Sequence, residues 1–307
     1  MDYGDISETF PASVDEATRR YQRARQDLGR AARDDDDSLA VARELAAATD
    51  RWLVELWEEA VPDELLDATA LLALGSYGRR ELSFHSDIDV MIELLDESWL
   101  ERDELHECVE RFMTWCRDSR VKLSHSVRTA AQTYREFGAD PRTTISLVDA
   151  RPLDGCTRPP SRNWSSEAIT ELRAEDQGET FISELMEGYE ARLDRHGQTV
   201  YLLEPDIKSG EGGLRDLNYL RWAAQVRWEF DPLASEAAPA GWTDEHRGKY
   251  ERGLQWLLRV RHLLHLHHER EHDRLNFPDQ EELAVHILGA PDEEIGRASC
   301  RERVYCE

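Results

Sequence analysis

The chain has 307 residues, of which 40% are hydrophobic and 33% are charged, and its formal net charge is −26 at pH 7. This is the composition of a soluble globular chain long enough for two domains, and no apolar run approaches the ~20 residues that a membrane span needs. A nucleic-acid-binding protein normally carries a basic patch, and none stands out, which argues against a polymerase, a tRNA-modifying enzyme or a DNA-binding module.

The location and redox environment are indicated by the first residues and the cysteines. The opening stretch MDYGDISETF is acidic and lacks the basic and apolar regions of a signal peptide. The five cysteines are irregularly spaced, which suggests free thiols rather than a disulfide framework. We therefore expect a cytoplasmic protein with no membrane association. Only three of the 38 basic residues are lysine, which fits equally a high-salt cytoplasm or a biased base composition.

Two helices are expected at the start of the chain, over residues 12–33 and 38–60. Ser38 is a candidate cap for the second helix, and Pro62 ends it. Leucine and tryptophan side chains supply the second helix with apolar surface. We interpret residues 1–62 as a packing pair of helices.

The most informative stretch is ATALLALGSYGRRELSFHSDIDVMIELL, residues 68–95. The apolar run 70–74 predicts a buried strand that ends at Gly75-Ser76. A second strand begins at Asp87-Ile88-Asp89. Because strand side chains alternate between faces, this strand has one apolar face and places Asp87 and Asp89 together on the other.

Two adjacent carboxylates repel each other unless a positive charge lies between them, and a divalent cation is the simple answer. Mg²⁺ takes carboxylate oxygens and keeps positions open for substrate phosphates. A Gly-Ser turn lets backbone N–H groups approach a phosphate, and Arg79 could add a fork of donors or support the turn. The combination predicts a nucleoside triphosphate site and in-line displacement at phosphorus. The alternative is an edge strand with a solvated acidic face.

A helix over about 100–118 and a strand over 121–129 should complete this domain, residues 63–157. Cys108 and Cys116 have no zinc-like spacing and are interpreted as core thiols. The strand 121–129 carries no third carboxylate. Glu93 or His125 could contribute a further ligand, although His125 is better explained as a structural hydrogen-bonding residue.

A Pro- and Arg-containing linker at 158–162 precedes a long charged helix, about 165–196. A glycine-rich loop at 209–213 then leads into another helix. Such loops can bind anions, and Lys208 and Arg215 would suit a triphosphate. The alternative is a plain loop before a helix N-terminus.

A further helix is expected over 243–272, and it ends in RHLLHLHHEREHDRL. His268-Glu269-Arg270-Glu271-His272 matches the zinc protease motif H-E-x-x-H, which needs a helix to place both histidines on one face. No third ligand follows at a suitable spacing, so we do not favour a protease. Nor do these histidines form a His-Asp phosphohydrolase site, whose ligands are dispersed over several helices.

The run GSYGRREL followed by SDIDV resembles the DNA polymerase β-like nucleotidyltransferase superfamily. More narrowly, these runs, with KLSHSVRT, LEPDIK and GGLRD, resemble the N-terminal part of the bifunctional uridylyltransferase/uridylyl-removing enzymes that modify the PII signalling protein. The resemblance implies an α+β fold, in which a small mixed sheet with flanking helices is followed by an all-helical domain. It also implies that a third metal-binding carboxylate need not be present.

The same resemblance implies a Mg²⁺-dependent transfer of UMP from UTP to a tyrosine of PII. Asp87 and Asp89 would be the catalytic, metal-binding residues. The nucleotide-binding residues would be Gly75, Ser76, Gly78, Arg79, Lys208 and Arg215. Two alternatives stay open: a transferase of the same fold with another specificity, such as protein adenylylation, and a catalytically silent regulatory or interaction module.

The end of the chain departs from the family pattern. Residues 295–307, IGRASCRERVYCE, are expected to be a non-native tail, after a helical uridylyltransferase-associated domain at 158–294. The uridylyl-removing domain and the ligand-sensing domains of the family are not expected in this chain.

Overall fold

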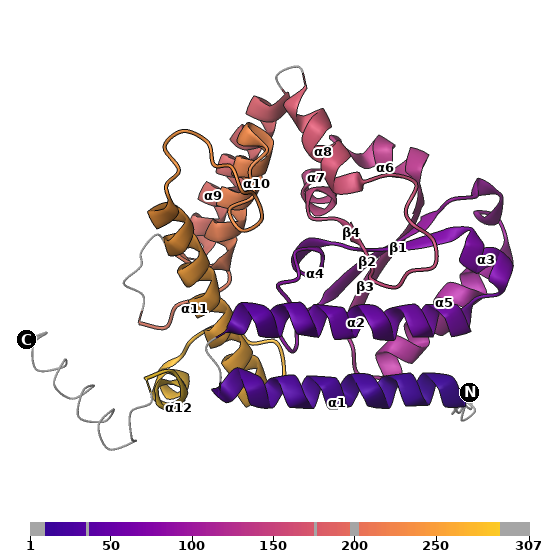
Figure 1. The fold of residues 1–307 in the computed structure, drawn as a ribbon, viewed down its shortest axis with the longest axis horizontal. Coiled ribbons are helices and arrows are strands. Elements are labelled where there is room, and N and C mark those ends of the chain that lie inside the picture. The colour runs from indigo at the N-terminus through magenta and orange to yellow at the C-terminus, as the bar shows by residue number, and fades with distance from the viewer. Residues whose placement is uncertain (1–9, 35–36, 175–176, 197–202, 289–307) are drawn as a thin grey trace, which may run out of the picture. The chain divides into compact units, whose positions relative to one another are not determined.

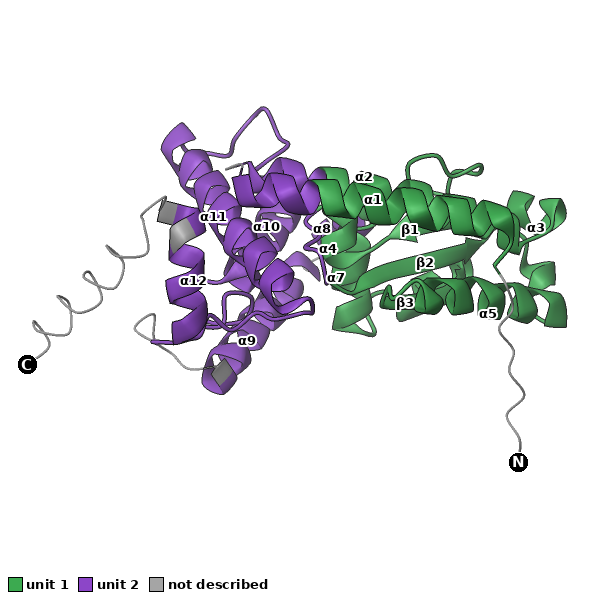
Figure 2. Cartoon of the chain, turned by 90° about the horizontal axis from the view of Figure 1, so that it is seen from below, with its two compact units in different colours: residues 1–27, 44–80, 86–165 green, residues 28–43, 81–85, 166–307 purple. Residues whose placement is uncertain are grey.

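The computed structural model describes residues 10–34, 37–174, 177–196 and 203–288, and the expected non-native tail lies outside them. The chain divides into two compact units, which are coloured separately in Figure 2. The first comprises residues 1–27, 44–80 and 86–165, and the second comprises residues 28–43, 81–85 and 166–307. The division expected from the sequence, at residues 62, 157 and 294, stays a prediction. No helix in the described ranges has the length and apolarity to cross a membrane.

A four-stranded sheet forms the centre of the first unit (Figure 1). Its strands are β1 (Thr69–Ala73), β2 (Ile88–Leu94), β3 (Leu123–Thr129) and β4 (Arg151–Pro152), in the order β3-β2-β1-β4. β1 pairs antiparallel with both β2 and β4, whereas β2 and β3 are parallel. The predicted small mixed sheet is therefore confirmed.

Helices cover both faces of this sheet. Between residues 63 and 148 the helices are α3 (Asp63–Asp67), α4 (Gly75–Gly78), α5 (Asp103–Asp118), α6 (Ala130–Glu136) and α7 (Pro141–Val148), with the short 3₁₀ helix η1 (Glu97–Trp99). In Figure 1, α5 lies on the side of α2, and α6 and α7 lie on the other side. All of β2 is buried except Asp89, which is partly exposed. Cys108 and Cys116 are buried free thiols of α5, as predicted.

The two N-terminal helices, α1 (Ala12–Asp34) and α2 (Ser38–Ala60), confirm the expected boundaries. Tyr21 stacks on Trp52 with ring centroids 4.6 Å apart, and the Trp52 indole donates to Thr18 Oγ1 at 3.1 Å. The expected cap at Ser38 is wrong. The cap is Asp37, the residue before the helix begins, whose side chain accepts a hydrogen bond from the N–H of Ala40 in the first turn at 2.9 Å.

Helices make up the regular structure described in the second unit beyond residue 165. They are α8 (Trp164–Arg173), α9 (Gln177–His196), α10 (Leu214–Trp228), α11 (Asp244–His268) and α12 (Phe277–Leu288). One core cluster joins Leu214 of α10 to Leu254 and Leu258 of α11. Another joins Ile207 to α11 and α12. The predicted α+β fold with a following helical part is confirmed.

Two predicted helices are shorter than expected. The single helix over 165–196 is instead α8 and α9, and a Cβ at Gly178 would lie 2.9 Å from the carbonyl oxygen of Leu172. The glycine thus lets the start of α9 lie close to the backbone at the end of α8. The helix over 243–272 ends at His268, because Glu269 takes a left-handed conformation with φ 51°.

Gly78 gives the sharpest test of packing in the first unit. A Cβ there would lie 2.1 Å from the carbonyl oxygen of Asp149, which is a severe clash with backbone. We expect Gly78→Ala to lower the free energy of unfolding by about 1–3 kcal/mol or more. Gly253, in the interior of α11, has open space at its Cβ position, so Gly253→Ala should be neutral or stabilising by up to about 1 kcal/mol. Urea denaturation of both variants checks this, and equal effects would contradict the close approach at Gly78.

His262 provides a pH test of the second unit. Its side chain is fully buried and burial lowers its pKa to about 3, while its Nε2 lies 3.1 Å from the Ser38 carbonyl oxygen. The unfolded chain binds a proton near pH 6.5, so stability is complete above that pH and is lost as the pH falls toward the folded pKa. The expected slope is about 1.4 kcal/mol per pH unit. His262→Gln should reduce the slope measured by denaturation, and exposed His106→Gln should not. An unchanged slope in His262→Gln would contradict this origin of the acid sensitivity.

Candidate active site

The turn after β1 brings a glycine beside a carboxylate of β2. Gly75 has φ +55°, a backbone conformation that favours glycine, and a Cβ at this position would lie 3.4 Å from Asp89 Oδ2. The N–H of Leu74 donates to the carbonyl oxygen of Asp89 at 2.9 Å. The predicted glycine turn and the predicted metal-binding strand therefore meet at one end of the sheet.

Ser76 and Gly78 belong to the single turn of α4 that starts at Gly75. Leu74 is the residue before this turn and makes no side-chain capping bond to it. The N–H of Gly78 donates to the carbonyl oxygen of Leu74 at 2.9 Å. Gly78 itself is buried against the backbone of Asp149 and Ala73, so the structure gives it a packing role.

Asp87 and Asp89 are both partly exposed, on either side of buried Ile88. Asp87 Oδ1 is buried and lies 2.7 Å from the Lys122 ammonium. The two atoms form an ion pair, but their angles are not those of a hydrogen bond. Lys122 precedes β3, and its carbonyl oxygen accepts the N–H of Ile88 at 3.0 Å. Sequence reasoning missed this partner, because the pairing of β2 with β3 is what places Lys122 beside Asp87.

Arg79 pairs with Asp149, at the end of α7. The exposed fractions of the two side chains are 6% and 1%, so the pair is held inside the first unit. Of the two predicted roles for Arg79, the geometry favours support of the turn over direct contact with phosphates. Asp149 gave no signal in the sequence, since nothing in its spacing links it to Arg79.

A second buried carboxylate, Asp50 of α2, holds the same turn. It accepts hydrogen bonds from the Tyr77 hydroxyl and from Arg151, whose two contacts measure 2.7 and 2.9 Å. Burial, and then the nearby Asp50 charge, raise the pKa of Tyr77 well above its usual value, so this hydroxyl stays protonated as a donor. The guanidinium of Arg151 also lies over the Tyr77 ring, 5.2 Å from its centroid.

The two candidates for a third metal ligand, Glu93 and His125, both lie away from the site of Asp87 and Asp89. The register pairs Val90 with His125, so His125 shares the face of Val90 and not that of Asp89. Glu93 does share the face of Asp89, but four residues of strand separate them by about 13 Å. Glu93 is fully buried and accepts the backbone N–H of Ser161 at 3.0 Å and its hydroxyl. Neither residue can join Asp87 and Asp89 around one ion.

Lys208 and Arg215 belong to the second unit. The Lys208 ammonium lies 2.8 Å from Glu271 and 3.6 Å from Asp273. Arg215 is exposed in the first turn of α10, and its N–H donates to the Lys208 carbonyl oxygen at 2.9 Å. The glycine-rich loop before it is well fixed: the Asp206 carboxylate accepts the N–H groups of Lys208 and Ser209 at 3.0 and 2.6 Å.

The Gly-Arg-Arg-Glu-Leu run also contains a residue of the second unit. Glu81 is buried and accepts a hydrogen bond from Arg221 of α10 at 2.8 Å, and Arg221 also pairs with Asp231 at 2.6 Å. This part of the motif is therefore explained by an ion-pair network.

The residues of the H-E-x-x-H match do not lie on one helix, because α11 ends at the first histidine of the match, His268. The protease interpretation is thereby excluded on geometry.

Comparisons with known proteins agree with the motifs. Two family models match: the nucleotidyltransferase family DUF294 over residues 20–118, and GlnD PII-uridylyltransferase over residues 180–303. Among curated relatives, the bifunctional uridylyltransferase/uridylyl-removing enzyme of Pseudomonas putida (strain W619) is 30% identical over 280 residues, which are 91% of this chain and 30% of that enzyme.

Other relatives have the same description. The enzyme of Pseudomonas entomophila (strain L48) is 33% identical over 76% of this chain, and that of Vibrio cholerae is 32% identical over 78%. The chain spans 25% and 26% of the length of these two enzymes. The expected resemblance is thereby confirmed: the chain carries a nucleotidyltransferase domain and is related to the bifunctional uridylyltransferase/uridylyl-removing enzymes.

Proposed function

We propose that this chain transfers a nucleoside monophosphate from a nucleoside triphosphate to a hydroxyl group, with UTP as donor and a tyrosine of the PII protein as acceptor. The observation that carries the proposal is the 3.4 Å approach of the Asp89 carboxylate to the Gly75 Cβ position. This approach supports the proposal because it sets a Gly-Ser turn, whose N–H groups could face phosphates, beside a carboxylate that could bind a metal ion. The names of the relatives supply the nucleotide and the acceptor class.

The donor atoms at Asp87 and Asp89 fit Mg²⁺. Both residues offer hard carboxylate oxygens, and Asp87 Oδ1 is a buried oxygen outside hydrogen-bond geometry. A cation at Asp87 competes with the Lys122 ammonium, which is 73% exposed and can move into solvent at little cost. When bound, Mg²⁺ would neutralise phosphate charge and lower the pKa of the acceptor hydroxyl.

The protein residues would orient the triphosphate. Backbone N–H groups of Gly75 and Ser76 would face its phosphates, and the pairs Arg79–Asp149 and Asp50–Arg151 would keep the turn rigid. The acceptor oxygen then forms a bond to the α-phosphorus as the bond to the bridging oxygen breaks, and pyrophosphate leaves with that electron pair. The hydroxyl proton passes to solvent, since the described residues around the carboxylates include no evident general base.

The proposal also includes two basic residues of the second unit. Lys208 and Arg215 would contact phosphates or the acceptor protein, which requires Lys208 to leave Glu271. The cytoplasmic location expected from the cysteines is likewise retained as a prediction. Adenylylation by the same mechanism and a silent interaction module are the two alternatives, and a single experiment separates them.

The test is intact-mass spectrometry of a PII protein incubated with this chain, Mg²⁺ and either UTP or ATP. We expect a UMP adduct on PII. Asp87→Asn with Asp89→Asn should lower the rate more than about 100-fold, because these ligands contact the ion directly and even indirect partners of metal sites are worth 10- to 100-fold. Asp67→Asn, an exposed aspartate paired with Arg158, is the matched control and should keep full activity.

Each other outcome assigns the chain differently. An AMP adduct would keep the mechanism and replace the nucleotide. Metal-dependent UTP binding without any adduct would favour the silent module. Transfer that survives in the double variant would contradict the assignment of Asp87 and Asp89.

A further inference from the structure

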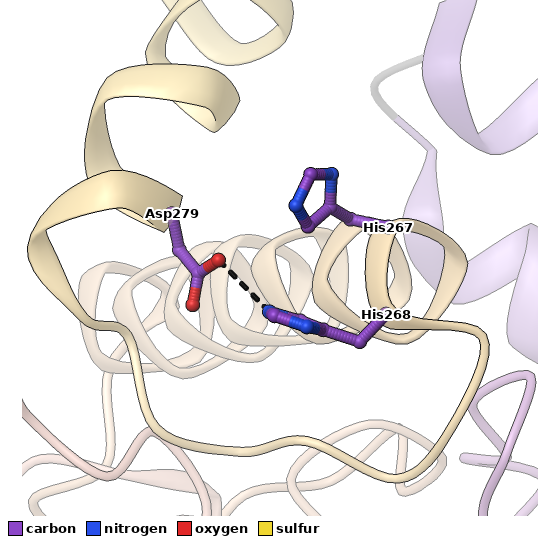
Figure 3. A group of neighbouring side chains, drawn as sticks. All are labelled: His267, His268 and Asp279. Atoms are coloured by element: carbon purple, nitrogen blue, oxygen red, sulfur yellow. Dashed lines mark hydrogen bonds and ion pairs between the residues drawn. The ribbon is translucent and has the colours of Figure 1, made fainter.

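Three histidines and one aspartate gather where α11 ends and α12 begins, within the second unit. Ligand atoms of His267, His268 and Asp279 all lie within 4.8 Å of one another. Figure 3 shows both imidazoles on the end of α11 and the Asp279 carboxylate on the first turn of α12. His268 Nε2 lies 2.8 Å from Asp279 Oδ1, and the fourth member, His272, has its Nε2 3.3 Å from Asp279 Oδ2.

The Asp279–His272 contact is unusual for a buried polar pair. The Asp279 side chain is 2% exposed, and its Oδ2 and the Nε2 of His272 are both buried without a hydrogen-bond partner. They face each other at 3.3 Å, yet their angles are unsuitable for a hydrogen bond. Buried polar atoms normally have a hydrogen-bond partner. Two buried atoms that can bind a metal and that face each other without a hydrogen bond therefore indicate a site for an ion.

Local backbone geometry creates this convergence. Glu269 ends α11 in a left-handed conformation, which sends the chain back and lets His272 reach its neighbour: the ring centroids of His268 and His272 are 4.0 Å apart. On the other side, Asn276 Oδ1 accepts the N–H of Asp279 at 3.0 Å and fixes the start of α12. The four side chains thus come from two helix ends and the loop between them.

The types of ligand atom in the cluster determine which class of metal ion fits it. Imidazole nitrogen with a single carboxylate suits Zn²⁺ and related transition metals, whereas Mg²⁺ and Ca²⁺ prefer oxygen. Donor atoms around tetrahedral zinc lie about 3.3 Å apart. The distances of 2.8 and 3.3 Å from Asp279 to His268 and His272 are close to that value, and the exposed His267 ring can rotate inward.

An entry route lies beside the cluster. His267 lines a cavity of about 210 Å³ together with Glu282, His286 and Arg33. Glu282 Oε1 is 3.8 Å from His267 Nδ1 and adds a negative charge there, whereas Arg33 adds a positive one. His267 therefore stands between the buried Asp279 and a space that water and ions can enter.

We propose that His267, His268, His272 and Asp279 bind a zinc-type transition-metal ion that joins the end of α11 to the start of α12. The ion would lie between His268 Nε2 and Asp279 Oδ1 in place of the hydrogen of their 2.8 Å contact, and His268 would keep its one ring hydrogen on Nδ1. Because the ligands come from two helix ends and the loop between them, the ion would stabilise the fold by joining these segments. The inference is independent of the function proposed above.

The test is equilibrium dialysis of the untagged chain against Zn²⁺, with Co²⁺ absorption as a second probe of tetrahedral nitrogen and oxygen ligation. We expect one ion per chain and a rise in the thermal midpoint with Zn²⁺, since an ion that binds the folded state stabilises it. Asp279→Asn and His268→Gln should each weaken Zn²⁺ binding about 100-fold or more, with circular dichroism confirming that each variant is folded.

Two controls isolate the site. His106→Gln removes an exposed histidine from α5, and Asp87→Asn with Asp89→Asn removes the carboxylates of the proposed active site; both should leave the tightly bound zinc in place. Zinc affinity unchanged in Asp279→Asn and His268→Gln would overturn the proposal, as would loss of binding in the Asp87/Asp89 variant. If the parent chain with Co²⁺ shows no absorption band of a tetrahedral site, the proposal is overturned whatever the variants show.

Discussion

The carboxylate of Asp50 is buried in the middle of α2, and three parts of the first unit donate hydrogen bonds to it. Tyr77 comes from the turn after β1, Arg151 from β4, and the N–H of Asp154 follows β4 at 3.1 Å. Removing one partner of a buried charge pair costs about 3–5 kcal/mol, because the other charge is left without compensation. The position of the turn beside Asp89 therefore depends on a helix that begins thirty or more residues earlier in the chain.

This constraint explains why the turn is built from small residues and buried pairs. Asp50 holds it from α2, Asp149 holds Arg79 from α7, and Gly78 lets the backbone of Asp149 come close. Since the turn is fixed from within, the partly exposed carboxylates of Asp87 and Asp89 are left at its edge. The structural charges are thus buried inside the unit, whereas the carboxylates of the proposed site are partly exposed.

Hydrophobic periodicity, prolines and glycines in the sequence were sufficient to predict α1, α2, the strands β1, β2 and β3 and the glycine turn, because each depends on neighbours in the chain. The mixed sheet was predicted from the family resemblance. The local patterns could not indicate the partners of Arg79, Tyr77 or Asp87, which lie 70, 27 and 35 residues away and meet only through packing. The end of α11 was missed for a related reason. Glu269 takes a left-handed conformation that its residue type does not favour, so the sequence pattern predicts a helix through the histidine motif and gives no sign of the contact with Asp279.

Charged side chains of the second unit gather around the carboxylate of Asp273. Arg261 pairs with Asp273 at 2.7 Å, His265 reaches the same carboxylate at 3.3 Å, and Lys208 also lies beside it. Burial opposes ionisation of Asp273, but His265 and Arg261 outweigh it and hold its pKa well below the usual range. Lys208 is thus held by an acidic network, and any anion that approached its ammonium would have to compete with the carboxylates of Glu271 and Asp273.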